Sequence, residues 1–283
     1  MSQDNRRIAV LISHSYGEPF KSLKELIQPL AWESLTASNV DVFFSIGKRS
    51  SKLSQMLDRK LTQWRYSEKL WILQRMVDTV SLSIYNIKLP KVIALGSTLQ
   101  TDIPEGVRFQ GAKTLACFRY LYENNYDIIY RTTMSTIPVT SNFLFVARTI
   151  DLDEPYYGGV VNTYASTSFV SGAGVFLNRG SLKLLDQNIH SWRHSDLDDI
   201  AISRILKKFV EPTELSAINV YDHESARDID VKLFETAIHV RCKSSQIPRD
   251  DLGIMEVVLE KYRKYLFQPS NQSIPERNPK SRS

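Results

Sequence analysis

A continuous apolar run from Ile8 to Ile12 opens the chain and constrains its fold most strongly. Arg6 and Arg7 precede this run, and the polar sequence Ser13-His14-Ser15 follows it. An apolar run without polar alternation is typical of a strand buried on both faces, as in parallel sheets covered by helices. Ligands of open α/β sheets bind where such strands end. The sequence therefore predicts an α/β fold in which Ser13 and His14 follow the first strand.

Strand-like and helix-like segments alternate through the first half of the chain. Expected strands cover residues 40–46, 90–95 and 126–130. Expected helices cover residues 21–37, with a kink or early stop at Pro29, the amphipathic stretch 53–77, and residues 113–122. This order predicts a Rossmann-like, mostly parallel central sheet with flanking helices.

The second half of the chain has a more mixed pattern. Strands are expected over residues 156–161, 169–177 and 237–242, and helices over 196–209 and 250–266. Both helices begin with Asp residues, which favour the positive end of a helix dipole. Because no Pro-, Gly- or Ser-rich linker divides residues 1–267, we expect one domain there. Apolar side chains nearly vanish over 268–283, which predicts a disordered basic tail.

Charge and cysteine content exclude several classes of protein. Lys and Arg exceed Asp and Glu by 36 to 31, but no block of basic residues occurs, so nucleic-acid binding is not expected. Cys117 and Cys242 are too few for a disulfide framework, and the histidines have no zinc-site spacing. No apolar stretch is long enough for a membrane span or a signal peptide. A cytoplasmic protein is expected, with the basic tail available for peripheral contact with the inner face of the membrane.

Two glycines interrupt an expected strand in the segment Ser171-Gly172-Ala173-Gly174. Glycine inside a strand weakens it and marks a place where a ligand or another backbone comes close. The segment could therefore accept a sugar ring or an acceptor. The alternative is a β-bulge or tight packing against a neighbouring helix.

Asp196, Asp198 and Asp199 begin an expected helix shortly after this segment. Carboxylates at a helix N-terminus cap the backbone and interact favourably with the dipole, and we expect one of the three to act as a cap. A carboxylate at the edge of a sheet can also accept a proton from an attacking hydroxyl group. The sequence leaves both roles open.

The order of these motifs resembles a known family. A strand ending in a polar motif, a Ser-Gly-x-Gly strand, a helix and then Asp-Asp-hydrophobic look like the fringe and β-1,3-galactosyltransferase-like glycosyltransferases of the GT-A fold, and most like their small bacterial and viral members. The resemblance spans roughly residues 8–243 and is dense between 113 and 202. It implies transfer of a sugar, with inversion, from a nucleoside diphosphate sugar, UDP-sugar favoured, to a hydroxyl of a glycan or lipid-linked saccharide.

In that family an Asp-rich motif follows the strand that corresponds to residues 126–130 and holds a divalent metal, Mn or Mg, on the donor. Here that place reads Arg131-Thr132-Thr133-Met134-Ser135, which has no carboxylate. Hard cations require oxygen ligands with negative charge, so a divalent metal stays possible here but lacks its usual Asp-rich motif. Arg131 could replace the ion, helped by hydroxyl groups of Thr132, Thr133 and Ser135. The alternative is an Arg that caps strand-end carbonyls or pairs with a surface carboxylate.

The resemblance also assigns roles to residues elsewhere in the chain. It places Asp198 and Asp199 on the family's acidic motif, where one would be the general base and the other would orient the acceptor or cap the helix. It gives Lys113 a donor-binding position, although a solvated helix Lys fits equally well. Ser13 and His14 fall where the family binds the nucleotide.

A basic face is expected near the C-terminus. Period-2 alternation puts His239, Arg241 and Lys243 on one side of a strand, with Arg249 nearby in sequence. That face could bind a diphosphate or an acidic acceptor, or it could be a solvated edge strand that discourages aggregation.

Two other functions compete with sugar transfer. A protein that kept the fold and lost catalysis would bind a nucleotide sugar or a glycan without reacting, which is compatible with the missing Asp-rich motif. A surface-binding protein would instead use the basic tail, and truncation at residue 268 would abolish its binding.

Overall fold

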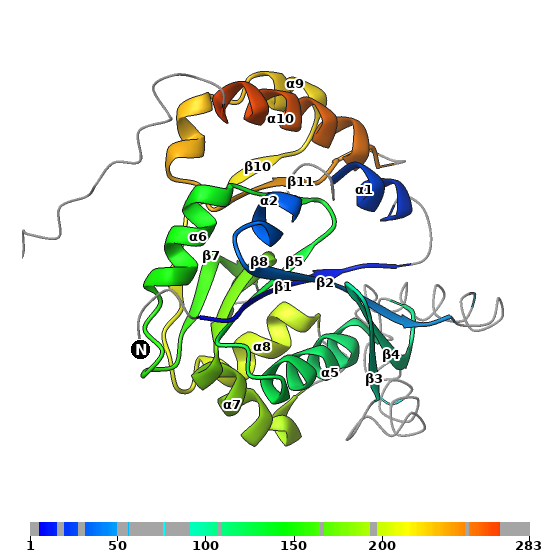
Figure 1. Ribbon diagram of the computed structural model, residues 1–283, viewed down its shortest axis with the longest axis vertical. Coiled ribbons are helices and arrows are strands. Elements are labelled where there is room, and N and C mark those ends of the chain that lie inside the picture. The colour runs from blue at the N-terminus through cyan, green and yellow to red at the C-terminus, as the bar shows by residue number, and fades with distance from the viewer. Residues whose placement is uncertain are drawn as a thin grey trace, which may run out of the picture.

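The fold is known from a computed structural model (Figure 1), which describes residues 6–15, 20–27, 32–49, 56, 76, 91–106, 109–164, 167–192, 197–246 and 249–266. Most of the expected helix over 53–77, the residue Asp196 and the tail 268–283 lie outside the described residues. The division into a domain over 1–267 and a tail therefore stays a prediction.

An eight-stranded sheet forms the centre of the molecule, with strand order β3-β4-β2-β1-β5-β8-β7-β9. Its strands are β1 (Ile8–Ser13), β2 (Val40–Lys48), β3 (Val92–Leu95), β4 (Thr98–Pro104), β5 (Ile128–Thr133), β7 (Tyr157–Tyr164), β8 (Thr167–Asn178) and β9 (Thr213–Glu214). The neighbours β4, β2, β1 and β5 are parallel, whereas β8 runs antiparallel to both β5 and β7. The expected Rossmann-like α/β fold, mixed in its second half, is confirmed.

Helices cover both faces of this sheet (Figure 1). One face carries α5 (Gln110–Glu123), α7 (Arg179–Gln187) and α8 (Asp198–Leu206), which pack on Ala9, Leu11 and Ile129. The other carries α1 (Phe20–Ile27), α2 (Glu33–Thr36) and α6 (Thr140–Thr149), which pack on Val10 and Ile128. Residues of β1 and β5 thus alternate between two cores, which explains why β1 is an unbroken apolar run.

A second, three-stranded sheet of order β10-β11-β6 lies beyond α2 and α6 in Figure 1. It consists of β10 (Ile218–Val220), β11 (His239–Cys242) and β6 (Thr136–Pro138), and it is accompanied by α9 (His223–Arg227) and α10 (Asp251–Leu266). Short 3₁₀ helices cover Ile189–Ser191 and Val231–Glu235. Val240, Met255 and Tyr262 share a core with Tyr130 of β5, so the small sheet is held against the large one.

Two strands differ from the sequence prediction in their position in the sheet or in their bounds. The third parallel strand is β4, whereas β3, over the expected segment, pairs antiparallel with β4 at the edge of the sheet. The turn at Gly96, with φ of 57°, makes this hairpin. β5 begins two residues later than expected and includes Arg131, Thr132 and Thr133, because tertiary partners satisfy these polar side chains inside the sheet.

Other expectations are met within a few residues. α5, β7, β8, β11 and α10 overlap the segments expected for them. The expected helix over 21–37 is described as two separate helices, α1 and α2. Cys117 and Cys242 are buried free thiols. No helix in the described part of the chain is long and apolar enough to cross a bilayer.

Candidate functional site

The candidate site lies at the carboxyl ends of β1 and β5, where the strand order reverses direction. From β1 the chain passes outward to β2 and β4, and then returns to the other side of β1 as β5. Open α/β sheets bind ligands in the crevice outside such a topological switch point. Ser13 pairs in register with Thr133, so the two expected donor segments meet at this edge.

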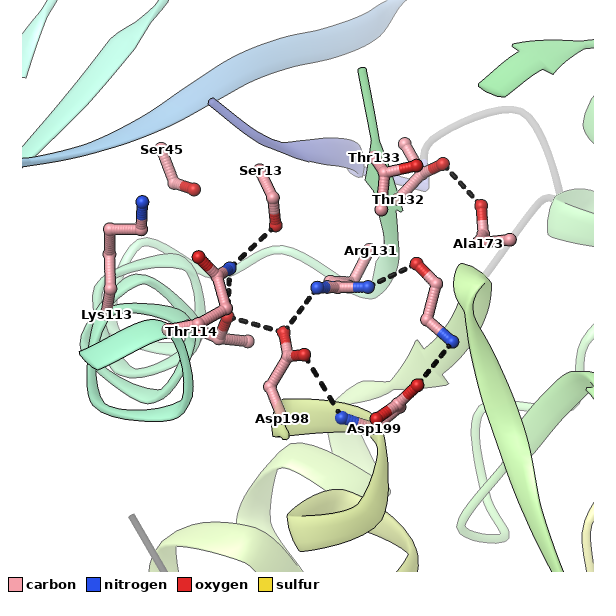
Figure 2. Close-up of polar contacts among 12 residues, drawn as sticks. Ser13, Ser45, Lys113, Thr114, Arg131, Thr132, Thr133, Ala173, Asp198 and Asp199 are labelled. Carbon is pink, nitrogen blue, oxygen red and sulfur yellow. Dashed lines mark hydrogen bonds and ion pairs between the residues drawn. The ribbon is translucent and has the colours of Figure 1, made fainter. Parts of the chain in front are cut away.

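Arg131 and Asp198 form a buried ion pair at the centre of the site. Arg131 Nη2 lies 2.6 Å from Asp198 Oδ2, and the two residues are 4% and 3% exposed. Arg131 Nη1 donates to the carbonyl of Gly172, and Thr114 Oγ1 donates to Asp198 Oδ2 at 2.7 Å. Figure 2 shows Arg131 of β5 pointing toward the first turn of α8. The guanidinium charge is therefore matched by a carboxylate of the protein itself.

Asp199 differs from Asp198 in both exposure and partners. It is partly exposed, and its Oδ2 accepts from Gly172 N at 3.0 Å while its Oδ1 accepts from Ile200 N at 2.9 Å. Burial, followed by the neighbouring charge of Asp198, raises the pKa of Asp199, and Arg131 opposes part of that rise. A carboxylate with a raised pKa beside an accessible edge of the sheet has the properties of a general base.

Neither aspartate is the N-cap of α8. Leu197 occupies that position, without a side-chain capping bond, and Asp198 and Asp199 form the first turn. The expectation that one of these two described aspartates is the N-cap is therefore wrong, although Oδ1 of each accepts from the next backbone N–H of the first turn, Asp199 N at 3.2 Å and Ile200 N at 2.9 Å. They still carry negative charge at the positive end of the helix dipole.

A bulge in β8 shapes the glycine segment. Gly159 of β7 pairs with Val175, but Val161 pairs with Val170, so residues 171–174 have no partner on β7, whereas Gly174 still pairs with Thr132 of β5. Backbone groups of this segment form hydrogen bonds with side chains instead. The carbonyl of Gly172 accepts from Arg131 and its amide donates to Asp199, and the carbonyl of Ala173 accepts from Thr132 Oγ1 at 2.6 Å. The β-bulge alternative is thus correct for this segment, and the bulge directs the amide of Gly172 toward Asp199 at 3.0 Å.

The two glycines have different neighbours. A Cβ on Gly172 would meet Arg131 Nη1 and lie 3.0 Å from Asp199 Oδ2. A Cβ on Gly174 would meet Tyr130 Oη and the ring of His239. Gly172 therefore makes room for the charged side chains, and Gly174 makes room for packing between the two sheets.

The basic residues of β11 face the same edge of the large sheet. His239 Nδ1 lies 2.8 Å from Tyr130 Oη, and Arg241 Nη1 lies 3.5 Å from Ser171 Oγ. Burial lowers the pKa of Arg241, and burial together with Arg241 and Arg249 lowers the pKa of Lys243, which follows the strand. Arg249 pairs with Asp251, whereas neither Arg241 nor Lys243 has an ion-pair partner among the described carboxylates. An excess of positive charge remains here, suited to an anion.

Lys113 and Ser13 occupy the opposite end of the site. Lys113 Nζ lies 3.2 Å from Glu105 Oε1 and donates to the carbonyl of His14 at 3.0 Å. Burial, together with Lys24 and Lys113, lowers the pKa of His14 to about 4. Lys113 is buried and paired, so it holds the end of β1 in place; the solvated alternative for this residue is wrong.

Several buried nitrogens of the site have no hydrogen-bond partner within the described part of the chain. They are His14 Nδ1, Arg131 Nε, His239 Nε2 and Arg241 Nε. Buried polar groups in native proteins are nearly all satisfied, so these four nitrogens are free to bond to water or to a bound group.

A family-type metal site does not fit these residues. In the described ranges no group of three or more His, Cys, Asp or Glu side chains is placed to hold an ion. At the position that the sequence resemblance assigns to a metal, Arg131 brings a positive charge, and Thr132, Thr133 and Ser135 bring neutral hydroxyls; Thr133 Oγ1 and Ser135 Oγ lie 3.4 Å apart.

The structure brings together most of the residues expected from sequence. Arg131, Asp198, Asp199, Ser171 and Gly172 converge, and His239 and Arg241 approach from the second sheet. Thr132 points to the opposite face of β5 from Arg131, as alternate strand residues do. Sequence reasoning missed Gln110 and Thr114 of α5. Their spacing of four residues, which puts two polar side chains on one helical face, is the signal that could have found them.

No protein-family model matches this sequence, and no curated protein sequence is significantly similar to it. Two crystal structures of the glycosyltransferase GlyE from Streptococcus pneumoniae TIGR4 are similar in backbone at 14% identity. One has a TM-score of 0.40 and is matched over 92% of this chain and 63% of its own. The other, the apo form, has a TM-score of 0.45 over 93% and 62%. This chain thus spans less than two thirds of the GlyE chain.

Proposed function

We propose that this protein is a glycosyltransferase that moves a sugar from a nucleoside diphosphate sugar, UDP-sugar favoured, to a hydroxyl of a glycan or lipid-linked saccharide. The observation that carries the proposal is Asp199, a partly exposed carboxylate of raised pKa at the switch point of the sheet. It lies against Gly172 N, in the segment through which the sequence resembles the fringe-like transferases.

In the proposed reaction Asp199 takes the proton of the acceptor hydroxyl. The acceptor oxygen attacks the anomeric carbon, the bond from that carbon to the diphosphate breaks, and its electron pair leaves with the phosphate oxygen. Attack on the face opposite the leaving group inverts the anomeric centre. General base catalysis of this kind contributes about 10²- to 10⁴-fold to rate.

The leaving diphosphate requires positive charge, and we assign this role to Arg241 and Lys243. Neither forms an ion pair with a described carboxylate, and Arg241 Nε is without a partner there. Arg131 is less suited, because its charge is matched by Asp198 and its side chain is buried. Replacement of a metal ion by Arg131 remains a hypothesis that these contacts do not favour.

Binding and transfer separate the proposal from its main rival, a protein that binds but does not react. Thermal shift with UDP and other nucleoside diphosphates tests binding, since a ligand at 100 times its Kd stabilises the folded state by about 2.7 kcal/mol. Transfer from a panel of UDP-sugars, with and without chelator, then tests catalysis. Binding without transfer would favour the rival, and complete loss of transfer in chelator would contradict a metal-free reaction.

Arg241→Gln tests the diphosphate assignment directly. We expect weaker UDP binding by about tenfold or more, because a charge-assisted hydrogen bond is lost. The matched control is Arg148→Gln, which removes an exposed arginine at the end of α6. Equal UDP affinity in both variants would show that the diphosphate binds elsewhere.

A cytoplasmic location with peripheral contact at the inner membrane face belongs to the proposal. Membrane flotation of the full chain, compared with a chain ending at residue 267, tests the membrane contact.

A further inference from the structure

Two carboxylates and one guanidinium are close together at the site, so their charges do not balance. When both aspartates are ionised, Asp198, Asp199 and Arg131 together carry one excess negative charge. Like charges at close range favour uptake of a proton by one member of the pair. Which carboxylate takes that proton decides which one can act as the base.

The hydrogen-bond donors around the two carboxylates are unequal. Asp198 accepts from Arg131 Nη2 at 2.6 Å, from Thr114 Oγ1 at 2.7 Å and from Asp199 N at 3.2 Å. Asp199 accepts only from backbone groups in the described contacts, Gly172 N and Ile200 N. Donors to the charged form of a carboxylate favour that form, so the negative charge is better supported on Asp198.

Thr114 is held so that its proton points to Asp198. Gln110 Nε2 donates to Thr114 Oγ1 at 3.3 Å and to Ser13 Oγ at 2.9 Å. With one lone pair engaged by Gln110, the Thr114 hydroxyl directs its proton to Asp198 Oδ2. This chain of bonds runs from the end of β1 through one face of α5 to α8 (Figure 2). Successive donors in such a chain polarise one another.

We propose that Thr114 is a positioning residue that divides the roles of the two aspartates: its hydroxyl, oriented by Gln110, fixes Asp198 as the ionised partner of Arg131 and leaves Asp199 as the proton acceptor. This inference rests on the proposed function for its catalytic meaning, but its electrostatic part concerns the ligand-free protein. The charged and titratable groups that face Asp199 are Asp198 on α8, Arg131 on β5, Tyr157 on β7 and Arg241 on β11.

The test compares Thr114→Val, which removes the hydroxyl at nearly constant shape, with Thr114→Ser, which keeps it. Carboxyl ¹³C NMR of aspartate-labelled protein, with Asp199→Asn to assign the signal, reports the titration without any substrate. Losing a donor to the ionised pair makes that pair take up its proton at higher pH. We expect the midpoint to rise by about one pH unit in Thr114→Val, a tenfold change in proton affinity, and to return in Thr114→Ser.

The pH profile of kcat/KM is the second readout, and its acid limb should move with the NMR midpoint. A Thr114→Val variant that loses rate equally at all pH values, with an unmoved midpoint, would show a merely structural role and overturn the inference. The same conclusion follows if the midpoint moves equally in Thr114→Ser. If wild-type protein transfers no sugar while the NMR midpoint still moves, the proposed function fails and the assignment of charge by Thr114 stands.

Discussion

The guanidinium of Arg131 and the carboxylate of Asp198 lie 2.6 Å apart, and both side chains are buried beneath the edge where the sheet would bind a ligand. Because of this ion pair, the neighbouring residues Asp198 and Asp199 have different roles. Asp198 neutralises a charge inside the protein, and Asp199, one residue later, remains partly exposed. Their substitutions should therefore have different consequences.

Asp198→Asn should mainly lower stability, and Asp199→Asn should mainly lower turnover. Removing one partner of a buried ion pair leaves the other charge uncompensated, which costs on the order of 3 kcal/mol. Loss of a general base lowers kcat by about 10²- to 10⁴-fold. Urea unfolding and steady-state transfer kinetics measure the two effects. The control is Asp186→Asn, whose 2.8 Å pair with Arg119 is partly exposed. Normal turnover in Asp199→Asn would refute its role as base.

Gly172→Ala should impair transfer more than it impairs folding. The added Cβ would meet Arg131 Nη1 and approach Asp199 Oδ2 to 3.0 Å, so both side chains must move. A displacement of about 1 Å at a reacting group can cost about 10²-fold in rate. Gly180→Ala is the control in α7, with its nearest neighbour Pro155 Cα at 3.2 Å. Comparison of kcat/KM and melting temperature checks the expectation, and equal kcat/KM in the two variants would contradict it.

The raised pKa of Asp199 predicts a pH-dependent stability difference between wild-type protein and Asp199→Asn. Between the unfolded value of 3.8 and the raised folded value, the native state binds more protons than the unfolded state. Wild-type stability relative to the variant should therefore rise as pH falls through the folded pKa, and level off below about 3.8. Urea unfolding of both proteins across this range measures it. A difference independent of pH would mean that Asp199 titrates normally.

His239 should stay neutral throughout the working pH range. Burial, followed by Arg241, lowers its pKa to about 3, and its ring contacts Tyr130 Oη. As pH falls below about 6.5, His239 binds a proton in the unfolded chain but stays neutral in the folded chain. His239 therefore lowers the free energy of unfolding as pH falls. Ring ¹⁵N NMR from pH 4 to 8 checks this, with the exposed His190 as reference. A charged ring at pH 6 would contradict the burial argument.

The local pattern of residues was enough to predict the class of fold, and it also assigned the candidate site to one edge of the sheet, which stays a prediction. The apolar run of β1 requires burial on both faces, and the alternation of elements that follows requires crossover helices. Asp198 and Asp199 at the start of a helix, and alternation along β11, could likewise be read from short-range spacing.

The sequence could not predict which residues far apart in the chain contact one another. Arg131 ends an apolar run and so resembles a strand-end loop residue; only Asp198, far along the chain, allows it to be buried inside β5. Whether Ser171 to Gly174 would bulge depended on the register between β7 and β8, and the role of Thr114 depended on α5 meeting α8. Local pattern determined the elements and the edge where they meet, whereas the tertiary structure decided which buried charge pairs with which, because that energy arises only when distant segments come together.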